Sequence, residues 1–332
     1  MTNIKEVAKY AGVSITSVSH VLNHPERVSE ELRKRVLQAI DTLNYHPSPS
    51  AQSLRTGRTN LIALLIPDIC NPFYPELVKV IQSELGKAGM DTLIYNTDVP
   101  GGRSVNHVTE YFRYISQKRV DGIIVAGEAL AGTEDFLQAL DLPTVYIGHL
   151  ETPVIDSVSI DDYAAAYDAT RYLIEKGHQH IGHISGERQF FSGRARQQGY
   201  EQALRDHGLP VEEHLIFAGT YLRPAGRAGI QHLLTQEQPP SAVFVANYLM
   251  ALGALGALYD MNKRVPNDIA LMAFDNIPEM EDVRPTLTTI DYNPNNVGQL
   301  AAQRLLEKLE GNTSEIPQSI RVPYTLVQRN SA

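Results

Sequence analysis

A short segment near the N-terminus, ITSVSHVL (residues 15–22), carries side chains of the types that read DNA bases. Thr16 can bond a base edge or touch a thymine methyl group, and Ile15 can make only apolar contact. Ser17 is expected on the same exposed side of the helix that residues 15–22 would form. His20 can donate to guanine O6 or N7, although it lacks the two-pronged fork of an arginine. The alternative is that His20 is a surface histidine without a partner. The segment therefore predicts base reading only where a suitable fold presents it to DNA.

The flanking residues predict short helices that would present this segment. Gly12 supplies a turn, and Ser14 is expected to cap the following helix, about Ile15 to Leu22, by accepting from a free backbone N–H. A third helix is expected from about Ser29 to Leu43. Two short helices joined by a tight turn are typical of a helix-turn-helix reader, but small three-helix units also serve as plain interaction domains. The first helix is indicated by apolar residues at helical spacing, which are Ile4, Val7, Ala8 and Ala11.

The segment HPSPSAQSLRTGRTN (residues 46–60), with its two prolines, predicts a boundary between the helical N-terminal part and the rest of the chain. Ser48 as cap and Pro49 as first helical residue could start one short helix that continues to Leu54. Such a helix is too short to be stable alone, so we expect it to form only against DNA or a partner subunit. A flexible tether with an incidental leucine is the alternative.

From residue 61 onward, strand and helix patterns alternate. Apolar runs predict strands at residues 61–66, 92–95, 122–126, 144–148, 180–185, 241–246 and 268–275. Helical patterns lie between them, for example at residues 76–88, 103–118, 162–176, 194–207 and 247–262. Repeated strand–helix units predict parallel sheets covered by helices, and roughly 270 residues exceed one comfortable core, so we expect two lobes.

Composition adds a basic head and an acidic body. Residues 1–60 hold eight Lys and Arg against five Asp and Glu, whereas the rest hold 21 against 33. A small basic head can approach a polyanion that the acidic body would repel. The single cysteine, Cys70, excludes an internal disulfide framework, and no apolar run is long enough for a membrane span or a secretory signal. We expect a soluble, cytoplasmic protein.

Enzyme motifs are missing from the sequence. There is no G-x-G-x-x-G after a strand, no phosphate loop, no H-E-x-x-H and no G-x-S-x-G elbow. The spacing of His178, His180 and His183 straddles a turn and a strand, which favours structural roles over metal ligation. We therefore expect no catalytic residue, no metal and no cofactor. A sugar- or nucleotide-metabolising enzyme and a substrate-capturing binding protein remain the alternative classes.

Polar and aromatic residues follow several of the predicted strands. Ligands of open α/β sheets bind beyond the carboxyl ends of the strands, which in a two-lobed protein means the cleft. This rule selects five candidates, which are Phe73, Tyr74, His149, Asn247 and Asp275. For each aromatic residue, core packing is the alternative.

The stretch IKEVAKYAGVSITSVSHVLN (residues 4–23) resembles, almost position by position, the N-terminal signature of the lactose-repressor (LacI) family, T-I-x-D-V-A-x-x-A-G-V-S-x-x-T-V-S-R-V-L-N. The likeness continues over almost the whole chain. It implies a bacterial transcriptional regulator that binds a palindromic operator as a homodimer. One departure is His20, which stands where Arg is common, as in the purine-repressor branch, so operator preference should differ. The DNA-binding residues that we assign on these grounds are Lys5, Ser14, Ile15, Thr16, Ser17, His20, Asn23, Ser53, Leu54 and Arg55.

The resemblance also implies the domain organisation. Residues 1–46 would form the all-α helix-turn-helix domain, and residues 47–60 the hinge helix and linker, with Leu54 wedged into the minor groove. Residues 61–332 would form an α/β two-lobed, periplasmic-binding-protein-like domain for effector binding and dimerisation. Lobe one would comprise about 61–160 and 292–319, and lobe two about 161–291 and 320–332. The chain ends without a leucine-heptad tail, so we expect a dimer rather than a tetramer.

The same resemblance assigns further residues to an effector pocket. It adds Phe190, Ser192, Arg196, Tyr221 and Tyr292 to the five candidates above. An acid and an arginine could hold the hydroxyls of a sugar by charge-assisted bonds while aromatic rings cover its faces. We expect a sugar or sugar derivative that releases the operator; a purine or nucleoside acting as corepressor is the alternative. Tyr248 stands where the family usually has Asp, which makes a simple transfer of ligand identity unsafe.

Overall fold

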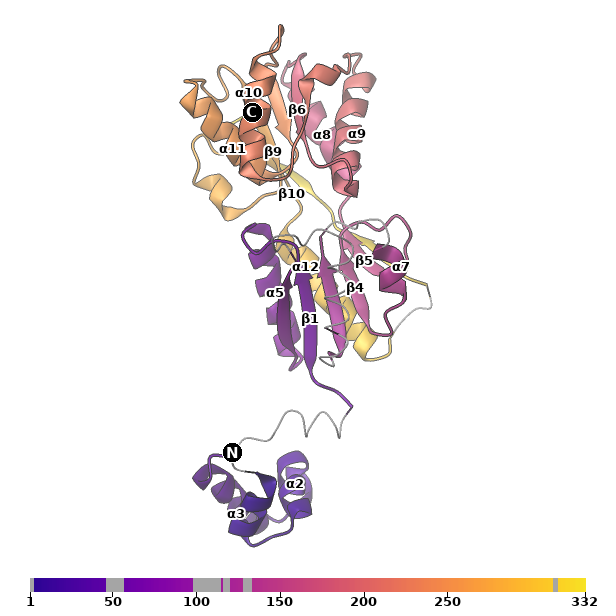
Figure 1. Cartoon of the computed structure of the whole chain (residues 1–332), viewed down its shortest axis with the longest axis vertical. Coiled ribbons are helices and arrows are strands. Elements are labelled where there is room, and N and C mark those ends of the chain that lie inside the picture. Colours follow the sequence, from indigo (N-terminus) through magenta and orange to yellow (C-terminus); the bar gives the residue numbers. More distant parts are fainter. Residues whose placement is uncertain (1–2, 46–56, 98–114, 116–119, 128–132, 313–315) are drawn as a thin grey trace. The chain divides into compact units, whose positions relative to one another are not determined.

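The computed structural model of the chain divides into two units, Met1–Thr59 and Asn60–Ala332 (Figure 1). The structure describes residues 3–45, 57–97, 115, 120–127, 133–312 and 316–332. The expected hinge helix and most of the helix expected at 103–118 lie outside these residues. Within them, no helix has the length and apolar character needed to cross a membrane.

The N-terminal unit is a small bundle of helices, and specific residues cap the ends of these helices. It contains α1 (Ile4–Ala11), α2 (Ile15–Asn23), η1 (Pro25–Arg27) and α3 (Glu30–Thr42). Asn3 and Glu6 form a capping box at the start of α1, and Gly12 ends this helix with a φ of 64°, a backbone region that suits glycine. Ser14 and Ser29 cap the next two helices through their side chains. The small core consists of Val7, Ala8, Val18, Val21, Val36, Ala39 and Tyr45.

The second unit holds two six-stranded sheets, one in each lobe. The lobe-one sheet has the order β11-β5-β4-β3-β1-β2, and the lobe-two sheet has the order β12-β10-β9-β8-β6-β7. Among the described strands, only β10 and β12 pair antiparallel. The first sheet comprises β1 (Leu61–Ile66), β2 (Asp91–Asn96), β3 (Gly122–Ala126), β4 (Thr144–Ile147), β5 (Asp156–Ser159) and β11 (Ser319–Arg321). The second comprises β6 (Ile181–Ser185), β7 (Ile216–Ala218), β8 (Ala242–Val245), β9 (Ala270–Phe274), β10 (Thr288–Asp291) and β12 (Thr325–Val327).

Helices cover both sheets, as parallel strands require. In lobe two, α8 and α9 lie on one side of the sheet and α10 and α11 on the other (Figure 1). Phe244 belongs to the core under α8 and α9, whereas Val243 and Val245 belong to the core under α10 and α11. Alternate residues of one strand therefore point into different cores. The lobe-one helices are α5 (Phe73–Lys87), α7 (Thr133–Gln138) and α12 (Pro294–Leu309). The lobe-two helices are α8 (Asp162–Glu175), η2 (Glu213–Leu215), α9 (Phe191–Asp206), α10 (Arg223–Leu234), α11 (Tyr248–Asp260) and η3 (Pro278–Glu281).

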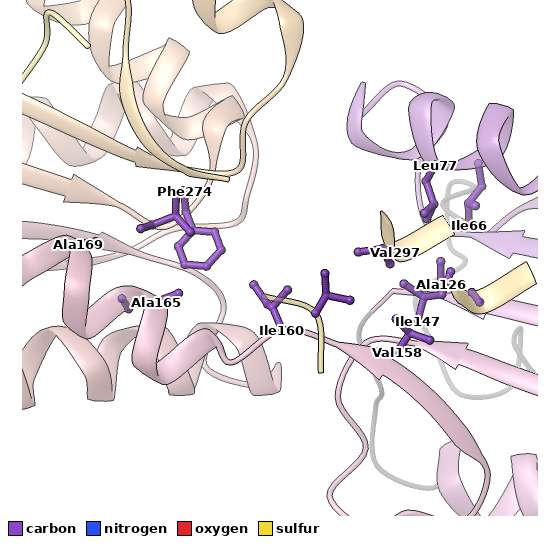
Figure 2. Packing of buried hydrophobic residues seen from close by; sticks show 14 of the residues in the cluster. Ile66, Leu77, Ala126, Ile147, Val158, Ile160, Ala165, Ala169, Phe274 and Val297 are labelled. Carbon is purple, nitrogen blue, oxygen red and sulfur yellow. The ribbon is translucent and has the colours of Figure 1, made fainter. Parts of the chain in front are cut away.

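The chain passes between the lobes three times: after β5, after β10, and between β11 and β12. β11 pairs with β5 as far as Arg321, two residues beyond the lobe boundary expected at residue 319. Buried residues continue across the first crossing. Figure 2 shows Ile160 between Phe274, Ala165 and Ala169 of lobe two and the lobe-one residues Ile66, Leu77, Ala126, Ile147, Val158 and Val297.

Helices α8 and α9 approach each other closely at Gly199. A Cβ atom added there would lie 2.3 Å from the carbonyl oxygen of Tyr163 and 2.9 Å from the backbone nitrogen of Tyr167, both on α8. Such distances are far below van der Waals contact, so only glycine permits this spacing of the two helices. The start of α8 is thereby held close against the middle of α9.

Candidate nucleic-acid interface and binding cleft

The structure separates the two faces of α2 as the sequence indicates. Val18 and Val21 are buried, whereas Ile15 is 44% exposed and Thr16 and His20 are exposed. The exposed face therefore offers a methyl-bearing hydroxyl, an apolar side chain and an imidazole, which suit thymine methyl groups and guanine edges. Its contacts with DNA remain predictions.

The other candidates for DNA contact divide into three groups. Ser14 caps α2 as expected, because its Oγ accepts from the backbone nitrogen of Ser17 at 3.0 Å. The Oγ atoms of these two serines also lie 2.9 Å apart. Lys5 is exposed on α1, and Asn23 is the last residue of α2. Ser53, Leu54 and Arg55 lie outside the described residues.

The second unit contains a cavity of about 300 Å³ between the carboxyl ends of the strands of both sheets. This position agrees with the rule that places ligands of open α/β sheets beyond their strand ends. The structure brings all ten residues of the expected effector pocket to its wall, namely Phe73, Tyr74, His149, Phe190, Ser192, Arg196, Tyr221, Asn247, Asp275 and Tyr292. Binding of an effector by these residues remains a prediction.

Arg196 extends from α9 into the floor of the cavity and is 7% exposed. Its Nε donates to Oδ1 of Asp162 at 2.7 Å, and its Nη1 donates to the carbonyl oxygen of Ala246 at 2.5 Å. The guanidinium carbon lies 3.7 Å from the ring centre of Phe274, a cation–π arrangement. Burial disfavours the charge, but the nearby carboxylates of Asp162 and Asp275 outweigh it and raise the pKa of Arg196. Arg196 is therefore a charged side chain that its contacts with Asp162, Ala246 and Phe274 hold in place.

Asp275 directly follows β9 and faces the same floor. Its backbone lies in the left-handed region with a φ of 72°, which is uncommon for a residue with a side chain. The carboxylate accepts from the Tyr292 hydroxyl at 3.0 Å and from the backbone N–H of Tyr248. Burial raises the pKa of Asp275, although Arg196 and these hydrogen bonds act in the opposite direction. Strand end, backbone conformation and hydrogen bonds together fix this acid at the cavity wall.

Tyr221 forms another wall of the cavity and is also held in the left-handed region, with a φ of 62°. The amide of Asn247 donates to its carbonyl oxygen at 2.9 Å, and its hydroxyl lies 2.7 Å from the Ser192 hydroxyl. Asn247 also caps α11 by accepting from the backbone nitrogen of Met250 at 3.0 Å. Much of the hydrogen-bonding capacity of Asn247 is therefore used to hold Tyr221 and α11 in place.

Tyr248, which stands where the family usually has Asp, is fully buried. It is not one of the described residues that line the cavity, and its hydroxyl has no hydrogen-bond partner within the described part of the chain. Burial raises the pKa of this phenol, and the nearby Asp275 adds to the effect. At this position the chain therefore has a buried aromatic ring where the family usually has a carboxylate.

Two contacts join the lobes beside the cavity. His149, after β4, stacks on Phe191 of α9 with ring centres 3.4 Å apart. Next to this stack, Arg194 of α9 and Glu151 of lobe one form an ion pair at 2.6 Å. Desolvation lowers the pKa of His149 and so favours its neutral form. The stack and the ion pair hold the present lobe angle on this side of the cleft.

Sequence reasoning missed several residues of the wall. They include Asp68, Asn71, Thr97, Asp162, Glu187, Gln189 and Phe191. Asp68, Asn71 and Thr97 follow β1 and β2, so the strand-end rule could have found them. Phe191 lies six residues after β6, so the same rule applies to it, whereas Asp162 follows β5, whose sequence DSVS contains no apolar run that would reveal a strand.

The histidine group has structural roles in the structure. His183 is fully buried between the rings of Tyr200 and Phe244, and its Nδ1 lies 2.9 Å from the Phe244 carbonyl oxygen. His178 contacts the Ser241 hydroxyl, and His180 lies 3.4 Å from Glu212. Among the described residues, no three His, Cys, Asp or Glu side chains gather at a metal-binding distance.

The chain is similar to known regulators over its full length. The family model described as bacterial regulatory proteins of the lacI family matches residues 3–48, and the periplasmic binding protein-like domain model matches residues 170–332. The HTH-type transcriptional repressor PurR of Photorhabdus laumondii subsp. laumondii is 33% identical over 335 residues, covering 100% of this chain and 97% of the relative. The PurR repressor of Yersinia pestis (strain Pestoides F) is 33% identical over 338 residues, with the same coverage.

Solved structures agree with this relationship. The lac repressor dimer bound to operator and the anti-inducer ONPF superposes with a TM-score of 0.90 at 26% identity, covering 99% of this chain and 98% of that one. The complex of the transcriptional regulator CelR with cellobiose has a TM-score of 0.75 at 29% identity and covers 100% of both chains. The expected fold class, a helix-turn-helix domain followed by a two-lobed α/β domain, is confirmed. The chain belongs to the lacI family of bacterial regulatory proteins, and it is a DNA-binding transcriptional repressor, not an enzyme.

Proposed function

We propose that this repressor binds a palindromic operator as a homodimer and that a small sugar or sugar derivative, bound in the cleft, releases it. The observation that carries the proposal is the composition of the cavity wall. Arg196, Asp275 and Ser192 provide fixed polar groups on the lobe-two side, and aromatic rings surround them. Polar groups that bond hydroxyls and rings that cover sugar faces are the usual elements of such sites. The volume of about 300 Å³ lies at the small end of ligand pockets.

The regulatory mechanism follows from the position of the cleft. A ligand between two lobes favours the lobe angle that surrounds it best, and it shifts the equilibrium only by its difference in affinity for the two angles. In a dimer, the lobe angle sets the spacing of the two chains at Leu61, where β1 begins. That spacing decides whether both N-terminal units can reach the two halves of one palindromic operator. Effector and operator are coupled reciprocally, by about 1–3 kcal/mol in typical cases.

A purine or nucleoside acting as corepressor is the second candidate. It is favoured by the two PurR repressors, which are 33% identical over the whole of this chain. Aromatic residues such as Phe73, Tyr74 and Phe190 could stack on a flat base as well as on a sugar. The sugar reading is supported by the CelR relative, whose structure contains cellobiose.

A ligand screen on the full-length protein separates the two candidates. Sugars, sugar derivatives, purines and nucleosides are tested by thermal shift, since a ligand well above its Kd raises the apparent stability by a few kcal/mol. Hits are then added to a complex with operator DNA labelled for fluorescence anisotropy. We expect a sugar to stabilise the protein and release the DNA. A purine that stabilises the protein and tightens operator binding would instead establish the corepressor function.

Variants locate the effect in the cleft. Asp275→Asn should abolish the ligand response while operator binding persists, because the carboxylate at the cavity floor is lost. Asp260→Asn is the matched control, since Asp260 belongs to an exposed ion pair with Arg227 of the same lobe. If Asp275→Asn binds the ligand like the parent in titration calorimetry, the assignment of the cleft is wrong.

A further inference from the structure

The cleft contains a cation that is already neutralised. Among the described residues of the wall, Arg196 is the single Lys or Arg side chain. Its Nε and Nη1 donate to Asp162 and to the Ala246 carbonyl oxygen, and one face of its guanidinium lies on Phe274. An arginine that binds an anionic ligand must offer its paired donors to that ligand. In this cleft, a protein carboxylate already accepts from the Nε edge.

Asp162 provides the carboxylate that accepts from Nε of Arg196. It lies in the first turn of α8, its side chain is 8% exposed, and its Oδ1 lies 2.7 Å from Nε of Arg196. The close approach of α8 and α9 at Gly199 holds the two side chains within reach. Asp162 also lines the cavity, so its negative charge faces the ligand directly. It thus acts on a ligand both through Arg196 and by its own charge.

The charges of the described wall sum to an excess of negative charge. Arg196 is opposed by four carboxylates, those of Asp68, Asp162, Glu187 and Asp275. Asp162, Glu187 and Asp275 all belong to the lobe-two wall, in the same region as Arg196. An uncharged ligand can exchange hydrogen bonds with this wall, whereas a phosphorylated ligand would lose its water shell and face like charges.

We propose that Asp162 is a specificity-determining residue, which neutralises Arg196 and restricts the cleft to uncharged ligands. Phosphorylated sugars and nucleotides are excluded, while the corresponding free sugars or nucleosides are accepted. This inference rests on the proposed role of the cleft as the effector site, but it concerns the charge of the ligand and holds for either candidate class. One like charge about 6–12 Å from a phosphate charge, at an effective dielectric constant of about 20, corresponds to about a tenfold to hundredfold difference in affinity.

The first test uses the wild-type full-length protein and inorganic phosphate. Phosphate is titrated at constant ionic strength, and stability is followed by thermal unfolding. We expect no stabilisation that depends on Arg196, because the cleft repels the anion. The DNA-binding unit can also attract phosphate, so Arg196→Gln is titrated in parallel. A stabilisation of the wild type that Arg196→Gln removes would show that the cleft accepts anions, and the proposal would fail.

The second test changes Asp162 itself. Asp162→Asn keeps an oxygen that can accept from Nε of Arg196 but removes the charge. We expect phosphate to stabilise this variant at concentrations about tenfold or more below any that stabilise the wild type, and the additional change Arg196→Gln to reverse that gain. Asp260→Asn removes one carboxylate from the exposed pair with Arg227 in the same lobe and should gain nothing.

The outcomes remain separable from those of the ligand screen. If Asp162→Asn folds and shows no gain for phosphate, Asp162 does not set the charge preference and the proposal is wrong. If this variant does not fold, the wild-type titration still decides whether the cleft refuses anions. Neither result depends on the operator or on which uncharged ligand is bound. Failure of the proposed effector function would instead appear as a ligand response that survives Asp275→Asn.

Discussion

Arg196→Met should strongly destabilise the protein, and Asp162→Asn should relieve part of that loss. Both side chains of this ion pair are less than a tenth exposed. Without the guanidinium, the carboxylate of Asp162 is buried with no compensating charge, a situation that typically costs about 3–5 kcal/mol. Converting Asp162 to Asn removes that charge, so we expect a favourable interaction energy of about 1–3 kcal/mol between the two substitutions.

A double-mutant cycle in urea measures this coupling. The chain has no tryptophan, so unfolding is followed by circular dichroism. The deficit of Arg196→Met should also be smaller at about pH 5 than at about pH 8. Burial already raises the pKa of Asp275, and loss of Arg196 raises it further. An acid with a raised pKa in the folded state stabilises that state at low pH, and this contribution is lost as the pH rises through the folded pKa. Strictly additive losses with no pH dependence would refute the reasoning.

Three further predictions concern single positions. Thr16→Ala and His20→Ala should each weaken binding to specific DNA by about 1–3 kcal/mol and to random DNA very little, in competition titrations at fixed salt; equal losses on both would remove the base-reading role. Ser14→Ala should lower the stability of the N-terminal unit by about 1 kcal/mol, because α2 loses its cap, and an unchanged melting temperature would contradict this. Burial lowers the pKa of His183 from 6.5 to about 4, so the unfolded chain binds a proton in this range that the native state excludes. Stability should therefore fall by about 3 kcal/mol as the pH drops from 6.5 to 4, and a slope that persists in His183→Gln would show another origin.

The fold was predictable wherever strands are continuously apolar. LIALLI and GIIVA are buried on both faces of a parallel sheet, so they stand out as apolar runs and coincide with β1 and β3. β5 has the sequence DSVS, and its Asp156 is buried because Arg304 and Lys308 of α12 pair with it. No hydrophobic pattern reveals such a strand. β7, β11 and β12 have three residues each, too few for any period to show.

The candidate cleft was predictable where residues follow strands and unpredictable where pairing is long-range. Asp275 comes directly after β9 and Asn247 two residues after β8, and both strands are buried, so the sequence places both residues at one edge. The partner of Arg196 lies 34 residues away on another helix. The residues around Asp162 in the sequence contain no pattern that predicts this ion pair, because the pair depends on how α8 and α9 pack together. The sequence likewise shows Asn247 as a polar residue at a strand end, but not its hydrogen bond to the strained Tyr221.

The missing side chain at Gly199 has a consequence for how the ligand preference of this repressor can change. Gly199 and Arg196 lie one turn apart on α9, and the adjoining α8 carries both Asp162 and the backbone atoms that a Cβ at 199 would strike. Adding one methyl group there would push the helices apart and stretch the ion pair at the cleft. Gly199→Ala should therefore alter which metabolites the repressor responds to, although residue 199 contacts no ligand in the cleft. In a genetic screen for new inducers, changes at such a helix contact belong among the expected hits beside changes in the cleft itself.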